Sequence, residues 1–231
     1  MTENTANLYS FRKLLILAWN RYWQYFGSLV SVFSIVFLLS LGLYFSIYGA
    51  DGFRALLNLP VTNEFPILNQ SNFLNILPVT LVDALFTSLG TGLIILIISQ
   101  RAKNLPDSLN KIRPRLMPFI LACLLMGAII MAGFIVLIIP GFIFGLWFIF
   151  TEYCVLLENK SPVLALRASR ELCRGVFFPV FWRVAGFYIL FFIIAGIINS
   201  VSVAGPLAVS IIMSPFAIVY LYELYQNLSR K

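Results

Sequence analysis

Long apolar runs alternate along the chain with short segments that hold most of its charges. The runs cover about residues 26–48, 76–100, 117–139, 141–157, 184–204 and 207–225. Most of them approach the ~20 residues that a helix needs to cross a hydrocarbon core about 30 Å thick. The pattern predicts an all-α polytopic membrane protein whose six transmembrane helices form three hairpins in a single domain, residues 1–231.

Two proline–glycine pairs are expected to separate neighbouring spans. As one helix, residues 117–157 would extend about 60 Å, twice the thickness of the hydrocarbon core. Pro140 and Gly141 lie inside this stretch. Proline removes a backbone donor and glycine tolerates turn dihedrals, so we expect the chain to reverse there. Gly205 and Pro206 are expected to do the same between the last two runs.

The composition supports a lipid environment. The chain has 231 residues, of which 61% are hydrophobic and 11% charged, and its mean hydropathy is +0.94. A soluble domain usually carries about a quarter charged residues. A chain with so few polar groups cannot cover its own surface in water, so we expect an integral membrane protein.

The basic residues predict an orientation. With the N-terminus inside, all 16 Lys and Arg residues except Arg54 fall on inner segments. An excess of Lys and Arg is typical of cytoplasmic loops, so both termini are expected in the cytoplasm. The membrane is expected to be the plasma (inner) membrane. The net charge of +7 then indicates contact with anionic lipid headgroups rather than with nucleic acid. A membrane-protein partner or a homo-oligomer remains open.

Short mixed segments precede each predicted hairpin on the inner side. They lie at about residues 7–24, 106–117 and 162–175, and each is expected to form an interfacial helix. The one long outer loop, residues 49–75, contains apolar residues and is expected to rest on the membrane surface.

The segment "SPVLALRASRELCRG" carries helix signals at both ends. Ser161 is a candidate N-cap, Pro162 suits the first helical position, and Gly175 suits the C-terminal cap. Its basic and small residues then fall on different faces. Arg167, Arg170 and Arg174 share one of them.

Small and apolar residues, including Ala165 and Ser169, occupy the other face of this helix. A helix so divided lies in the interface, with its arginines toward phosphates and its small face against the protein. It serves either as a binding site for headgroups or a partner, or simply as an anchor that fixes the topology.

Acidic residues inside apolar runs are candidates for function, because a charge at membrane depth is costly unless it is paired or hydrated. Asp83, Glu152 and Glu223 are such residues. We expect Glu223 to reach the inner interface and Arg183 to reach Glu152. Glu158 marks the inner boundary of the fourth span. Together they form a proton or cation relay, or else they are separate structural residues.

Residues of the common catalytic constellations are scarce. The chain has no His, and Cys123, Cys154 and Cys173 lie far apart without metal-ligand spacing. It also lacks a P-loop, a GxGxxG fingerprint and a nucleophile elbow. We expect no enzymatic activity, no metal and no cofactor.

The stretch "LIIPGFIFGLWFIFTEYCVLLENKSPVLALRASRELCRGVFF" resembles a group of bacterial six-span proteins classed with the membrane domain of glycerophosphoryl diester phosphodiesterases. The resemblance implies six helices with interfacial helices on the inner side, and no assigned activity. The catalytic phosphodiesterase domain is not expected in this chain. The matching positions are Pro140, Gly141, Glu158, Ala165, Leu166, Ser169 and Gly175.

Two functions follow from these patterns. The first is a non-enzymatic membrane or envelope component that scaffolds or assists lipids or proteins. The alternative is a transporter or channel for a small solute or an ion, working through the intramembrane carboxylates.

Overall fold

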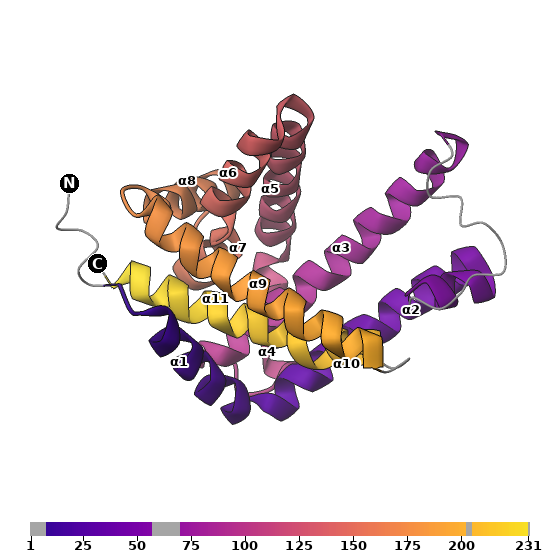
Figure 1. Ribbon diagram of the computed structural model, residues 1–231, viewed down its shortest axis with the longest axis horizontal. Helices are drawn as coiled ribbons and strands as arrows, with labels where there is room; N and C mark the ends of the chain where they lie inside the picture. Colours follow the sequence, from indigo (N-terminus) through magenta and orange to yellow (C-terminus); the bar gives the residue numbers. More distant parts are fainter. Residues whose placement is uncertain (1–7, 57–69, 202–204, 231) are drawn as a thin grey trace.

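The computed structural model describes residues 8–56, 70–201 and 205–230, and every regular element in these ranges is a helix (Figure 1). A short 3₁₀ turn, η3 (Arg113–Arg115), and a π-helical segment, η4 (Val209–Met213), accompany the α-helices. The α-helices are α1 (Phe11–Gln24), α2 (Phe26–Leu56), α3 (Gln70–Ile98), α4 (Leu105–Ile112), α5 (Leu116–Val136), α6 (Ile138–Phe148), α7 (Thr151–Glu158), α8 (Pro162–Cys173), α9 (Phe177–Val201), α10 (Gly205–Ala208) and α11 (Ser214–Ser229).

Within the described ranges, six helical segments are long and apolar enough to cross a membrane by length and composition. The prediction of an all-α fold with six apolar segments is therefore confirmed. They are Phe26–Ile47, Pro78–Ile98, Leu105–Val136, Ile138–Glu158, Phe177–Ser200 and Val209–Ser229.

Two helix pairs project from a common base in different directions (Figure 1). One pair is α2 with α3, and the other is α5 with α6. Helices α9 and α11 run side by side across the base, where the rings of Phe187 and Tyr220 stack with centroids 4.1 Å apart. Gly90 lets α3 approach α2, because a Cβ at this position would lie 2.6 Å from Cγ2 of Val36.

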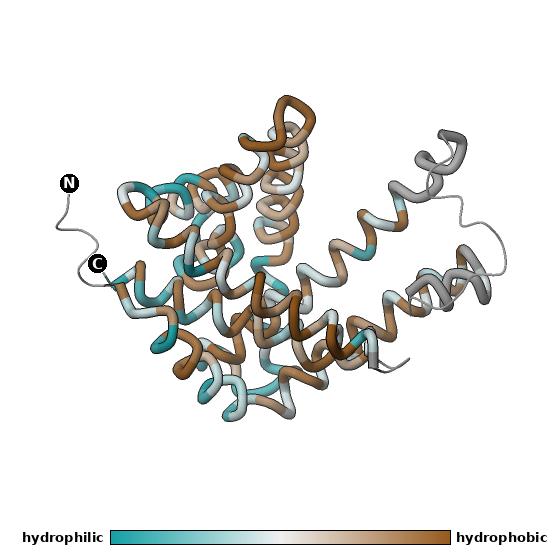
Figure 2. Tube along the Cα trace, in the orientation of Figure 1, coloured by the Kyte–Doolittle hydropathy of each residue, from teal (hydrophilic) through white to brown (hydrophobic). Residues whose placement is uncertain are grey.

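The core lies where α1, α3, α7 and α11 meet. Its largest fully buried side chains include Tyr153, Tyr220 and Phe150. The end of the α5–α6 pair is apolar but exposed, in contrast to this buried core. Ile135 is 80% exposed there and Ile139 is 72% exposed. Figure 2 shows this end as strongly hydrophobic, whereas hydrophilic residues gather near α8 and the chain termini. Lipid is the solvent that such an exposed apolar surface requires.

The turn between α5 and α6 differs from the prediction. The chain reverses at Leu137, whose backbone is extended (φ −161°, ψ 147°), and not at Pro140 and Gly141. Pro140 lies in the first turn of α6, where backbone N–H groups have no partner within the helix. Gly141 instead permits close packing, because a Cβ there would lie 2.5 Å from the ring of Phe134.

The fourth and fifth predicted spans also have different bounds. Residues 141–157 were expected as one helix, but the chain breaks at Ile149 and Phe150, between α6 and α7. Helix α9 begins at Phe177 rather than at residue 184, so Arg183 lies within its second turn. Gly205 opens α10, in agreement with the expected break before the last span.

Helices α2 and α3 extend into the two ends of the predicted outer loop, residues 49–75, and its middle part, residues 57–69, lies outside the described residues. Helix α2 bends at Gly49 (φ +62°), which only glycine adopts readily, and continues to Leu56. Helix α3 begins at Gln70. The expected position of residues 57–69 on the membrane surface lies outside the described ranges.

Candidate functional site

Helix α8 begins at the predicted residue but ends earlier than expected. Ser161 precedes it in extended conformation (φ −63°, ψ 159°) and Pro162 takes the first helical position, although the Ser161 side chain makes no cap hydrogen bond. The helix ends at Cys173, two residues earlier than expected. Gly175 follows with φ +79°, a left-handed conformation that favours glycine. The chain can therefore turn directly from α8 into α9.

The small face of α8 packs against the break between α6 and α7. The backbone N–H of Phe150 donates to Oγ of Ser169 at 3.1 Å, and this hydroxyl donates to the carbonyl oxygen of Trp147 at 2.7 Å. One turn further along α8, the Cys173 thiol donates to the carbonyl oxygen of Leu146 at 3.4 Å. Ser169 and Cys173 are fully buried. These side chains satisfy backbone groups that a helix break leaves without partners.

The opposite face of α8 is basic and exposed. Arg167, Arg170 and Arg174 are all solvent- or lipid-accessible. The Arg170 guanidinium lies 4.5 Å from the ring centroid of Trp147, and Arg174 lies 3.5 Å from the carboxylate of Glu171. The buried small face and the positions of Arg167 and Arg170 agree with the sequence pattern. Arg174 differs, because it lies just beyond the helix in extended conformation (φ −65°, ψ 131°).

Other arginines bind the carbonyl ends of helices. Arg101 and Arg115 both donate to the Leu156 carbonyl near the end of α7, at 3.2 and 2.7 Å. Arg21 donates to the Ile98 carbonyl at the end of α3, at 2.9 Å. Helix C-termini carry unpaired carbonyls and partial negative charge, so cations stabilise them. The sequence pattern indicated only that these arginines lie on inner segments, and it did not predict this role.

Glu158 lies at the end of α7 and joins three segments. It accepts a hydrogen bond from the Tyr225 hydroxyl of α11 at 2.5 Å and pairs with Lys160 at 2.5 Å. The hydrogen bond from Lys160 to Glu158 raises the pKa of that ammonium group. Asn159 between them is left-handed (φ 56°) and ends α7. Glu158 therefore helps to fix the turn between α7 and α8.

The three acids of the apolar runs have three separate sets of contacts. Asp83 accepts a hydrogen bond from the Ser40 hydroxyl at 2.5 Å. Glu152 lies 3.6 Å from the Cys123 sulfur. Glu223 pairs with Arg21, which also lies over the Tyr222 ring, 5.0 Å from its centroid. A single relay joining the three acids has no support in these contacts.

One sequence expectation for these groups is wrong, and one is not tested. Glu223 is buried, with 7% of its surface exposed, against Arg21 of α1, and its expected position at the inner interface stays a prediction. Arg183 does not bond Glu152, since it donates to the carbonyl oxygens of Tyr9 and Pro179 at 2.9 and 2.8 Å. The sequence separation of 202 residues between Arg21 and Glu223 hid their pairing.

Among the described residues, no group of three or more His, Cys, Asp or Glu side chains is arranged to hold a metal ion. Comparisons with models of known families, with curated proteins and with solved structures find no match to this chain. The resemblance to the membrane domain of glycerophosphoryl diester phosphodiesterases therefore stays a prediction.

Proposed function

We propose that this protein is a non-enzymatic component of a bacterial-type inner membrane, which gathers anionic lipid headgroups at helix α8 on its cytoplasmic side. The observation that carries the proposal is the docking of α8. Its small face is held by the bonds of Ser169 and Cys173, so Arg167 and Arg170 stay exposed on a fixed helix, and Arg174 follows directly after its end. Arginine suits this role because its planar guanidinium binds phosphate oxygens in pairs.

The charge pattern of the whole chain supports the orientation. In the proposed topology both termini are cytoplasmic, and basic residues concentrate on that side. Anionic headgroups of the cytoplasmic leaflet attract nearby basic residues by about 1 kcal/mol each. Helix α8 would then lie at the level of these headgroups, between two apolar segments that enter the lipid.

The transporter alternative is not favoured by a specific contact. It depended on Asp83, Glu152 and Glu223 sharing one cavity, whereas each has its own partner: Ser40, Cys123 and Arg21. These contacts suit separate structural roles in the protein interior.

A measurement of lipid preference tests the proposal. The full chain would be purified in mild detergent with equal amounts of phosphatidylglycerol and phosphatidylcholine, and retained lipids would be counted by native mass spectrometry. We expect retention of phosphatidylglycerol in the wild type. Combined Arg167→Gln, Arg170→Gln and Arg174→Gln should weaken it by about fivefold for each arginine lost, or about 1 kcal/mol per residue.

A control variant has the same change in charge. Arg12→Gln, Lys103→Gln and Arg230→Gln remove three exposed basic residues outside α8. This control should keep the wild-type preference for phosphatidylglycerol over phosphatidylcholine. Equal loss in both variants would mean that net charge, and not α8, recruits the lipid, and the proposal would be wrong.

A further inference from the structure

Two cavities meet beside α8. The larger has a volume of about 710 Å³ and lies between the α5–α6 turn, α6 and the first half of α9. The smaller, of about 560 Å³, lies next to α8. Ile143 and Phe177 line both cavities, so the two adjoin at these side chains. Each volume is in the range of known ligand pockets.

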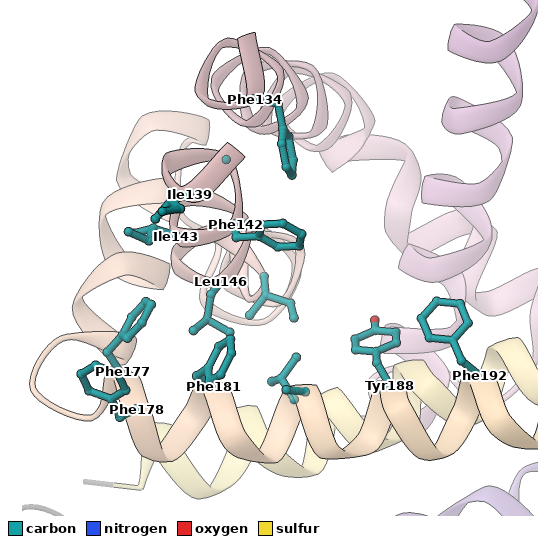
Figure 3. A pocket seen from close by; sticks show the side chains of 15 residues that line it. Phe134, Ile139, Phe142, Ile143, Leu146, Phe177, Phe178, Phe181, Tyr188 and Phe192 are labelled. Carbon is teal, nitrogen blue, oxygen red and sulfur yellow. The ribbon is translucent and has the colours of Figure 1, made fainter. Parts of the chain in front are cut away.

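The larger cavity has an apolar, aromatic lining. Figure 3 shows side chains of α6, such as Phe142 and Leu146, facing a row on α9 that includes Phe181 and Phe192. The Tyr188 hydroxyl is directed into the same space. Contact between a lining of this kind and a hydrocarbon chain is favourable, because it removes apolar surface from water. The lining has few groups that could hydrogen-bond a polar solute.

The helices that line the larger cavity have lengths close to the thickness of one leaflet of a bilayer. Helix α6 has 11 residues, which gives a length of about 16 Å. Half of the hydrocarbon core is about 15 Å. The stretch of α9 from Phe177 to Phe192 is longer, at about 22 Å. A single acyl chain that starts beside α8 would therefore run the length of this cavity.

The smaller cavity has the charge that a lipid headgroup requires. Arg170 and Arg174 line it together with one carboxylate, Glu171. Only Arg174 contacts that carboxylate, at 3.5 Å, whereas Arg170 lies against Trp147. Two guanidinium groups beside one carboxylate leave a net positive site, which favours a phosphodiester.

We propose that the two cavities form one site for a single anionic phospholipid. Its phosphate lies at Arg170 and Arg174, and one acyl chain lies between α6 and α9. This inference rests on the proposed function, because it needs α8 at the level of the headgroups. It adds a defined place for the acyl chain, which a general attraction of lipid to the basic face would not provide.

A photocrosslinking experiment locates the acyl chain. The full chain in mixed micelles would receive phosphatidylglycerol with a photoactivatable group near the end of one acyl chain, with phosphatidylcholine in excess. Mass spectrometry of the digested protein would then identify the labelled peptides. We expect labels concentrated in residues 138–149 and 177–192. A phosphatidylcholine probe with the same acyl group should label these peptides at least fivefold less, as expected for ~1 kcal/mol of lost attraction.

Two glycines provide a matched pair of variants. Gly145 lines the larger cavity, and Gly196 lies on α9 outside it. A Cβ at either position meets no atom within 4 Å, so a side chain can start from both without a clash at its first atom. Gly145→Leu fills the cavity and should abolish labelling of residues 138–149 and 177–192. Gly196→Leu should leave the labelling unchanged.

The arginines of α8 provide the second pair. Arg170→Gln with Arg174→Gln should reduce the labelling, whereas Arg12→Gln with Lys103→Gln, two exposed basic residues that do not line the cavity, should not. Full labelling in Gly145→Leu would overturn the acyl-chain site and leave the proposed function standing. Equal labelling by phosphatidylcholine would overturn both. Complete competition by millimolar glycerol phosphate would show a site for the headgroup alone and would also overturn this inference.

Discussion

The Oγ atom of Ser169 lies 3.1 Å from the backbone nitrogen of Phe150 and accepts its hydrogen bond. This contact joins α8 to Phe150, in the break between α6 and α7, and the two residues are 19 positions apart in the sequence. The same hydroxyl donates to Trp147 on the other side of the break. One small side chain thus supports both the break in an apolar segment and the position of the arginine face.

Ser169→Ala should destabilise the protein by about 1–3 kcal/mol, because it leaves buried backbone groups of Phe150 and Trp147 without partners. The free energy of unfolding in detergent, measured by titration with a denaturing surfactant, checks this. Ser200→Ala is the control. The Ser200 hydroxyl is exposed and donates to the Ile197 carbonyl of its own turn, so its removal should change little. Equal effects of the two changes would contradict the role of Ser169.

Arg21→Met should cost about 3 kcal/mol, because it leaves the buried Glu223 carboxylate without its cationic partner. Adding Glu223→Gln to the same chain should recover most of the loss. A double-mutant cycle in the same unfolding assay measures this coupling. Glu171→Gln, which breaks an exposed contact with Arg174, should leave stability unchanged. Additive effects of Arg21→Met and Glu223→Gln would argue against the pair.

Hydropathy was enough to predict the six apolar segments and the two-faced character of α8, because both depend on periodicity along one stretch of chain. The partners of the acids were not predictable in this way. Arg21 and Glu223 come from opposite ends of the chain and meet only because α1 packs on α11. The break between α6 and α7 was not predicted for a similar reason. The side chain that bonds its free backbone groups, Ser169, comes from α8 later in the chain.

Cys173 should react slowly with maleimides. Burial raises the pKa of its thiol to about 12, and the thiolate is the reactive form. With Cys123→Ala and Cys154→Ala in place, its rate at pH 8 should be on the order of a thousandfold below that of an exposed thiol, whose pKa is about 8.5. Arg167→Cys with Cys173→Ala provides that exposed comparison on the same helix.

The pH dependence of stability at Cys173 has a defined sign. Its folded-state pKa lies above the unfolded value of about 8.5, so the stabilisation is complete below about pH 8.5. It is lost as the pH rises toward about 12. Cys173→Ala should therefore reduce the dependence of unfolding on pH between 8.5 and 10. Rapid alkylation of Cys173 at pH 8 in the folded protein would contradict the docked position of α8.

The α5–α6 turn should lie inside the hydrocarbon and not reach the outer water. The sequence has no polar side chain from Met131 to Phe144. Two backbone bonds hold the turn, because the Leu137 N–H donates to Gly133 at 3.0 Å and the Leu137 carbonyl accepts from Gly141 at 3.4 Å. Backbone bonds of this kind lower the cost of placing a turn in lipid.

Labelling of a cysteine at the turn measures whether water reaches the turn from either side of the membrane. In a chain otherwise free of cysteine, Leu137→Cys should resist a membrane-impermeant maleimide from both sides of sealed vesicles and react after solubilisation. Ser200→Cys, at the exposed far end of α9, should react from the outer side. Labelling of Leu137→Cys from outside would show that α5 and α6 are two complete spans.

The depth of α8 tests the central claim most directly. A nitroxide would be attached at Arg167→Cys, in a chain otherwise free of cysteine and reconstituted into phosphatidylglycerol vesicles. Its accessibility to oxygen and to a water-soluble nickel chelate would be measured by electron paramagnetic resonance. The account predicts a label at the level of the phosphates, which moves toward water when phosphatidylcholine replaces phosphatidylglycerol. A label fully accessible to the nickel chelate in both lipids would place α8 in bulk water and contradict the account.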